Sequence, residues 1–124
     1  MTAEYQRIKK LFTELCAQHE FSFPPDRKPL DAPSKQGVYI IRKNGIVLHV
    51  GRTLRGTGGL RQRLMNHLHG ASSFTNEYLK GKGATLREKG YTYQFLVVED
   101  TRLRALLEAC AIGTLCPKHV GLGE

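Results

Sequence analysis

An Asn-Gly pair between two short apolar runs is the feature that most restricts how this chain folds. Asn44-Gly45 separates residues 37–43 (GVYIIRK) from residues 46–52 (IVLHVGR), and both runs are rich in β-branched residues. Asn-Gly flanked by such runs is the strongest short-range signal for a tight hairpin, because both residues tolerate a positive φ. The sequence therefore predicts an antiparallel hairpin over residues 37–52.

Two registers of this hairpin are compatible with the turn. A two-residue turn pairs Lys43 with Ile46 and leaves Tyr39 and His49 on opposite faces. A three-residue loop pairs Arg42 with Ile46 instead and places Tyr39 directly opposite His49. We favour this second register, because it separates the apolar side chains more cleanly. Its two faces hold Val38, Ile40, Ile46, Leu48 and Val50 on one side, and Tyr39, Ile41, Val47 and His49 on the other.

Helical periodicity and one further strand complete the expected fold. Residues 4–20 and 59–69 carry apolar stripes at helical spacing, and Gly70 predicts the end of the second helix. Residues 73–80 favour a short helix, and residues 91–98 favour a third strand. A last helix is expected from an N-cap at Thr101 to about Leu115, before Pro117. This order predicts an α+β fold, a small antiparallel three-stranded sheet flanked by helices.

The length of the chain sets its domain organisation. A chain of 124 residues is long enough for one hydrophobic core and too short for two. Proline and polar residues after the first helix predict an extended linker without regular structure. We therefore expect residues 1–36 to form an N-terminal helix and extended linker, residues 37–124 to form the functional domain, and both to make one compact unit.

The cysteines and the missing targeting signals bear on location. Cys16, Cys110 and Cys116 leave one thiol unpaired in any disulfide scheme, which favours a reducing, intracellular and cytoplasmic setting. No apolar run reaches the roughly 18 residues of a membrane span, and the N-terminus does not resemble a signal peptide. A zinc site from Cys110, Cys116 and His119 matches no standard ligand spacing, so we interpret the cysteines as buried structural thiols.

A formal net charge of +8 indicates a polyanionic partner. Positive side chains gather between Arg52 and Lys89, where only Glu77 and Glu88 oppose them. Such a stretch is typical of a surface that follows a phosphate backbone. The candidate substrate-binding side chains are Arg52, Arg55, Arg61, Lys80, Lys82 and His119.

Several short motifs together resemble the GIY-YIG endonuclease family. Residues 37–39 (GVY) and 49–51 (HVG) resemble the two tripeptides that give the family its name. Residues 60–64 (LRQRL) resemble its helix motif, in which the arginine is Arg63, and His67 matches a histidine of some members. The resemblance covers residues 37–120. Tyr39 and Arg63 also have plainer interpretations, as an ordinary strand tyrosine and a solvated helix arginine.

Glu108 is the most informative single residue. It is the only carboxylate in the apolar segment 103–116, and it stands where the family has its metal-binding glutamate. A buried carboxylate needs a partner, which is either a metal ion or Arg104, one helical turn earlier. We favour the metal ion, because this intrahelical ion pair would contribute only about 0.2–0.5 kcal/mol.

The resemblance implies a metal-dependent endonuclease that hydrolyses phosphodiester bonds in DNA, with RNA not excluded. Tyr39 would take a proton from the attacking water, Arg52 would favour its phenolate and His49 would accept its proton. Arg63 would neutralise phosphate charge, and His67 would orient the phosphate or the water. One divalent cation, Mg²⁺ or Mn²⁺, would bind to Glu108. The implied catalytic residues are thus Tyr39, His49, Arg63, His67 and Glu108.

The chain departs from the family pattern at three places. His49 replaces a usual tyrosine, Arg52 stands where some members have lysine, and no asparagine follows Pro117, where His119 offers a polar side chain instead. The alternative function is therefore a catalytically impaired nucleic-acid-binding module of the same fold, whereas a basic protein–protein adaptor has no positive support. A homodimer or a targeting partner stays open, because so short a chain has little room for a targeting domain.

Overall fold

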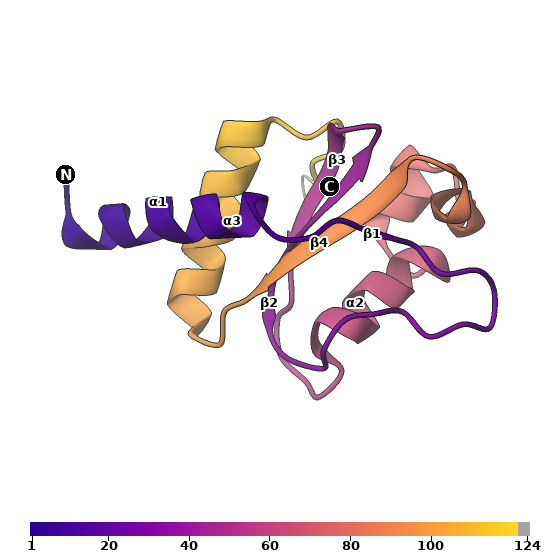
Figure 1. The fold of residues 1–124 in the computed structure, drawn as a ribbon, viewed down its shortest axis with the longest axis horizontal. Coiled ribbons are helices and arrows are strands. Elements are labelled where there is room, and N and C mark those ends of the chain that lie inside the picture. Colours follow the sequence, from indigo (N-terminus) through magenta and orange to yellow (C-terminus); the bar gives the residue numbers. More distant parts are fainter. Residues whose placement is uncertain (122–124) are drawn as a thin grey trace.

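The structure is a computed structural model that describes residues 1–121, and its sheet carries helices on both faces (Figure 1). The strands are β1 (Phe21–Ser22), β2 (Gly37–Lys43), β3 (Ile46–Arg52) and β4 (Tyr91–Val97), in the spatial order β1-β4-β2-β3. The helices are α1 (Ala3–Cys16), α2 (Gly59–Leu68) and α3 (Thr101–Leu115), with a short π-helix η1 (Phe74–Tyr78) and a short 3₁₀ helix η2 (Gly83–Arg87). The predicted α+β fold is confirmed, but the antiparallel sheet has four strands instead of three.

The additional strand comes from the segment that was predicted to be an irregular linker. Phe21 pairs with Tyr93 and Ser22 with Thr92, so this segment forms one edge of the sheet. The chain then continues without strand or helix to β2, and on the way it buries Phe23, Leu30 and Ala32 in the core. The linker prediction is therefore wrong at residues 21–22.

The hairpin turn is the two-residue form. Lys43 pairs with Ile46 around Asn44 and Gly45, whose φ values of 49° and 83° are those of a type I′ turn. The three-residue loop that we favoured from the sequence is therefore wrong. The Asn-Gly pair adopts the conformation that its backbone preferences allow most readily.

A β-bulge within the hairpin nevertheless brings Tyr39 and His49 to one face. The register shifts between Ile41 and Arg42, so that His49 lies opposite Ile41, and Tyr39 lies opposite Gly51. Alternate residues of a strand share a face, so His49 lies on the face that Ile41 and Tyr39 share. The predicted shared face is confirmed, with ring centroids 6.1 Å apart, although the two residues are not directly paired.

The sheet separates two apolar clusters. One cluster lies between the sheet and α2, and it includes the predicted stripe Leu60, Leu64 and Leu68. The other lies between the sheet, α1 and α3, and it includes Leu15 and Leu107. The bulge moves Leu48 to the α2 side and Val47 to the α3 side, opposite to the predicted faces. The side chains of Tyr39 and His49 therefore point toward α2.

Helix ends agree with the sequence signals except at two places. Gly70, with a φ of 79°, follows the end of α2 as predicted. The N-cap of α3 is Asp100 instead of Thr101, because the Asp100 carboxylate accepts from the backbone N–H of Leu103 at 2.9 Å. The first helix ends at Cys16, earlier than the predicted residue 20.

The cysteines do not behave as predicted. Cys116 is exposed, and Cys16 and Cys110 are only half-buried, so the interpretation as buried structural thiols is wrong for Cys116. Within residues 1–121, no group of three or more His, Cys, Asp or Glu side chains is arranged to hold a metal ion. Over the same residues, no helix combines the length and apolar character that a membrane crossing requires.

Candidate active site

Tyr39 and His67 form a buried hydrogen-bonded pair between the sheet and α2. Tyr39 comes from β2, His67 comes from the last turn of α2, and the phenol oxygen lies 2.6 Å from Nε2 of His67. Both side chains are fully buried. Gly51 leaves room for this contact, because a Cβ at position 51 would collide with the Tyr39 hydroxyl. We predicted that His49 accepts the proton of Tyr39, but in this structure the hydrogen-bond partner of the Tyr39 hydroxyl is His67.

The hydroxyl groups beyond His67 fix which of its nitrogens carries the proton. Nδ1 of His67 lies 2.7 Å from Oγ of Ser72, and Ser72 donates its own proton to Oγ1 of Thr75 at 3.1 Å. Thr75 in turn donates to the backbone carbonyl of His67 at 2.5 Å. Because a hydroxyl donates only once, Ser72 must accept from Nδ1–H of His67. Nε2 of His67 is therefore bare, and Tyr39 donates to it.

Burial keeps both members of this pair neutral. It raises the pKa of Tyr39 to about 12, although the nearby Arg63 guanidinium acts in the opposite direction. Burial, with smaller contributions from the neighbouring His49 and Arg63, also lowers the pKa of His67 to about 2. The cation beside the phenol is thus Arg63, and the prediction that Arg52 plays this part is wrong.

Arg52 is instead the partner of Glu108. The guanidinium Nε of Arg52 donates to Oε1 of Glu108 at 3.0 Å, and both side chains are partly exposed. Burial raises the pKa of the Glu108 carboxyl, and the Arg52 charge opposes that rise. The alternative partner, Arg104, forms no ion pair with Glu108. The Arg104 guanidinium donates instead to the backbone carbonyls of Thr53, Leu54, Val98 and Glu99.

A cavity of about 210 Å³ brings four of the predicted site residues together. His49, Arg52, Arg63 and Glu108 all line it. Nε of Arg63 is buried and has no hydrogen-bond partner among residues 1–121. A buried guanidinium N–H without a partner costs free energy, so an anion such as phosphate is its natural ligand. The cavity thus combines cationic donors with one carboxylate.

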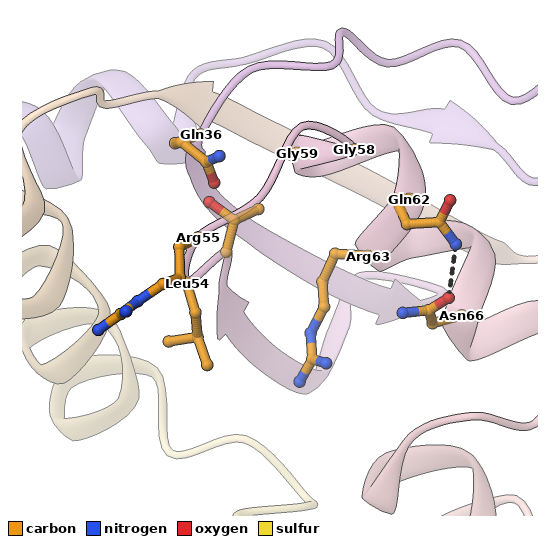
Figure 2. A pocket seen from close by; sticks show the side chains of 9 residues that line it. Gln36, Leu54, Arg55, Gly58, Gly59, Gln62, Arg63 and Asn66 are labelled. Carbon is orange, nitrogen blue, oxygen red and sulfur yellow. Dashed lines mark hydrogen bonds between the residues drawn. The ribbon is translucent and has the colours of Figure 1, made fainter.

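Arg63 also borders a second cavity, which lies between α2 and the loop that follows β3 (Figure 2). Figure 2 shows its side chain extending from α2 into the space between that helix and Leu54, while Gln62 and Asn66 hydrogen-bond to each other at 2.8 Å. Arg63 therefore joins the two cavities, and the plainer interpretation of a fully solvated helix arginine does not fit its buried Nε.

A row of three polar side chains runs from the cavity that Glu108 lines to the surface, and it consists of His49, His119 and Glu77. Nδ1 of His49 lies 3.2 Å from Nδ1 of His119, and Nε2 of His119 lies 2.7 Å from Oε1 of Glu77. Burial lowers the pKa of His49 to about 3, with further contributions from His119 and Arg63. Sequence reasoning singled out His49 and His119 separately, but it gave no role to Glu77.

Most of the predicted phosphate-binding side chains lie outside the cavity that Glu108 lines. Arg55 lines the second cavity, and Lys80 and Lys82 are exposed between η1 and η2. Arg61 is exposed as well, but its Nε donates to the backbone carbonyl of Ala32 at 2.9 Å. Among the six predicted residues, Arg52 is the one that lines the cavity of Glu108.

Glu108 fits the requirements of a divalent metal ligand. Mg²⁺ and Mn²⁺ prefer hard oxygen ligands, and one carboxylate suffices where phosphate and water complete the coordination. Burial works against the ionised form of Glu108, so a nearby positive charge in addition to Arg52 would stabilise its carboxylate. The donor set of this cavity is therefore compatible with one ion held by Glu108.

Comparison with solved structures identifies the fold. The chain is similar to the GIY-YIG N-terminal endonuclease domain of UvrC from Thermotoga maritima bound to magnesium, with 23% identity and a TM-score of 0.54, over 97% of this chain and 100% of that one. A point mutant of the same domain, bound to its catalytic divalent cation, matches with 22% identity and a TM-score of 0.54, over 98% and 99% of the two chains. No protein-family model and no curated protein matches the sequence. The similarity extends beyond the predicted range into the N-terminal segment, and the chain has a GIY-YIG endonuclease-like fold.

Proposed function

We propose that this chain is a metal-dependent endonuclease that hydrolyses phosphodiester bonds in DNA. The observation that carries the proposal is the cavity that Glu108 and Arg63 line together, with Nε of Arg63 unpartnered among residues 1–121 and the Tyr39–His67 pair nearby. The net charge of +8 supports a polyanionic substrate. The fold supports the same reaction class, because the similar UvrC domain is an endonuclease bound to magnesium.

In this proposal Tyr39 and His67 act as a proton shuttle. The attacking water gives a proton to the phenol oxygen while the phenol gives its own proton to Nε2 of His67. Concerted transfer avoids a free phenolate, which the pKa of about 12 disfavours. A phosphate bound to Arg63 would bring negative charge toward His67 and would favour the protonated imidazole that results.

Arg63 and Glu108 serve the phosphate in the same proposal. Arg63 donates to the phosphate oxygens, and its interaction strengthens as negative charge develops in the transition state. Glu108 would hold the divalent cation, which supplies positive charge for the phosphoryl group and the leaving oxygen. Arg52 favours the ionised form of Glu108, because its charge opposes the rise in pKa that burial causes.

Cleavage of supercoiled plasmid tests this function. We expect nicking or linearisation with Mg²⁺ or Mn²⁺ and none with EDTA. Glu108→Gln and Tyr39→Phe should each lower the rate by a factor of about 10² or more, because each removes a group that acts in the transition state. Glu88→Gln and Tyr5→Phe change the same residue types at exposed positions and should cleave like the wild type.

One observation favours a second function, a nucleic-acid-binding module that does not cleave. The Glu108 carboxylate already has an ionic partner, Arg52, at 3.0 Å. If that ion pair persists in the presence of Mg²⁺, DNA would bind equally well with and without EDTA, and no product would form. Metal-dependent cleavage that Glu108→Gln abolishes would exclude this alternative.

A further inference from the structure

The row of His49, His119 and Glu77 connects the cavity with solvent. His49 lines the cavity, His119 is buried, and the Glu77 side chain is 57% exposed. The three residues come from β3, from the segment after α3, and from η1, so they are far apart in the sequence. From the sequence, His49 was expected to replace a usual tyrosine, and His119 to offer a polar side chain in place of a usual asparagine. In the structure these two histidines are neighbours, with 3.2 Å between their Nδ1 atoms.

Backbone contacts and ring packing hold this row in place. The backbone N–H groups of Lys118 and His119 donate to the carbonyls of Val47 and Leu48, at 3.2 and 2.9 Å, which attaches the C-terminal segment to β3. The ring of His49 stacks on Phe74, with centroids 4.8 Å apart and an interplanar angle of 21°. The orientation of His49 is therefore determined by three separate elements of the fold.

The hydrogen bonds of the row give it a direction. A carboxylate accepts, so Nε2–H of His119 donates to Glu77. Nδ1 of a neutral His119 is then an acceptor, and Nδ1–H of His49 must donate to it. This leaves Nε2 of His49 without a proton. Between neutral rings the row therefore has one direction, from His49 through His119 to Glu77.

We propose that Glu77, acting through His119, holds His49 in the Nδ1–H form, so that the bare Nε2 of His49 accepts a hydrogen bond from the attacking water. This inference rests on the proposed nuclease function. In this arrangement His49 contacts a reacting atom, whereas His119 and Glu77 are positioning residues.

The positions of Tyr39 and His49 explain how Nε2 of His49 would orient the attacking water. Their rings share one face of the sheet, with centroids 6.1 Å apart, and His49 lines the cavity of Arg63 and Glu108. A water between them has two protons, of which one goes to the phenol oxygen and one points at Nε2 of His49. Its lone pair then faces the phosphate, which fixes the direction of attack. The low pKa of His49, about 3, agrees with a neutral acceptor.

Long-range ¹H–¹⁵N correlation spectra of the full chain, labelled on histidine, test the proposal without any need for cleavage. We expect His49 to carry its proton on Nδ1 in the wild type at pH 7.5. Glu77→Ala should shift His49 toward the Nε2–H form. Glu77→Gln should retain the Nδ1–H form, because the glutamine carbonyl still accepts from His119. Glu14→Ala, which removes an exposed glutamate from α1, is the charge-matched control.

Cleavage rates provide the second measurement. We expect Glu77→Ala to lower kcat about tenfold through loss of orientation, with much of the rate recovered in Glu77→Gln. An Nε2–H form of His49 in the wild type, or an unchanged spectrum in Glu77→Ala, would overturn the proposal. So would a wild-type kcat in Glu77→Ala. If the wild type does not cleave at all, the nuclease function fails and the role in water attack fails with it, while the spectra still decide whether Glu77 sets the protonation of His49.

Discussion

Among the single residues, Gly51 has the most direct influence on the geometry of the site. It lies opposite Tyr39 in the hairpin, and a Cβ at this position would collide with the hydroxyl and the ring of Tyr39. Tyr39 is fully buried, so its ring has no space into which it could move. The length of the side chain at position 51 therefore decides whether the phenol reaches His67.

We expect Gly51→Ala to lower stability by about 1–3 kcal/mol, as overpacking of a core does. Its cleavage rate should fall by about 10², because the phenol oxygen moves away from Nε2 of His67. Urea unfolding and plasmid cleavage measure the two effects. Gly113→Ala is the matched control: nothing lies near the added Cβ in α3, so stability should rise by about 0.5–1 kcal/mol. Unchanged cleavage in Gly51→Ala would contradict this account of Tyr39.

Among the elements, α3 is tied to the end of β3 by one side chain. Arg104, only 3% exposed, donates to the carbonyls of Thr53 and Leu54 after β3 and to those of Val98 and Glu99 before α3. Glu108 lies one turn further along the same helix. Arg104 therefore sets how α3 presents Glu108 to the cavity.

We expect Arg104→Met to lower the free energy of unfolding by at least about 3 kcal/mol, because it leaves several buried carbonyls without donors. Arg104→Lys should lose less, since an ammonium still donates to some of them. Arg102→Met removes an exposed arginine from the same helix and should leave stability nearly unchanged. Urea unfolding compares the three variants. Equal stability losses in Arg102→Met and Arg104→Met would contradict the anchoring role.

The elements also show where sequence reasoning succeeds and where it stops. Spacing and local chemistry predict the hairpin, α2 and α3. Tyr39 and His67 were singled out by the resemblance of short motifs to a known family, and Glu108 also because it is the only carboxylate in an apolar helix. The β-bulge is not visible in the sequence, since one added residue changes the pairing without changing the apolar pattern. The contacts of Ser72 and Glu77 depend on tertiary structure. The only signal for Glu77 was its position as an isolated carboxylate in a basic stretch.

For the whole molecule, burial of the His49 and His67 imidazoles makes stability depend on pH. Burial holds the pKa of His49 near 3 and that of His67 near 2, whereas a histidine of the unfolded chain titrates near 6.5. Below pH 6.5 the unfolded chain therefore binds protons that the folded chain does not. Stability is fully present above that pH and is lost as the pH falls toward 3.

Between pH 7 and pH 5 we expect the free energy of unfolding to fall by about 4 kcal/mol, close to 2 kcal/mol for each buried histidine. The slope of each histidine reaches about half of its full value near pH 6.5 and steepens as the pH falls further, whereas Glu108, whose pKa is raised by burial, acts in the opposite direction at the acid end. Urea unfolding at a series of pH values measures it. His67→Gln should remove about half of the slope, whereas His69→Asn, which replaces an exposed histidine, should keep it. A flat profile in the wild type would mean that the folded chain protonates both rings, which is incompatible with His67 as the acceptor for Tyr39.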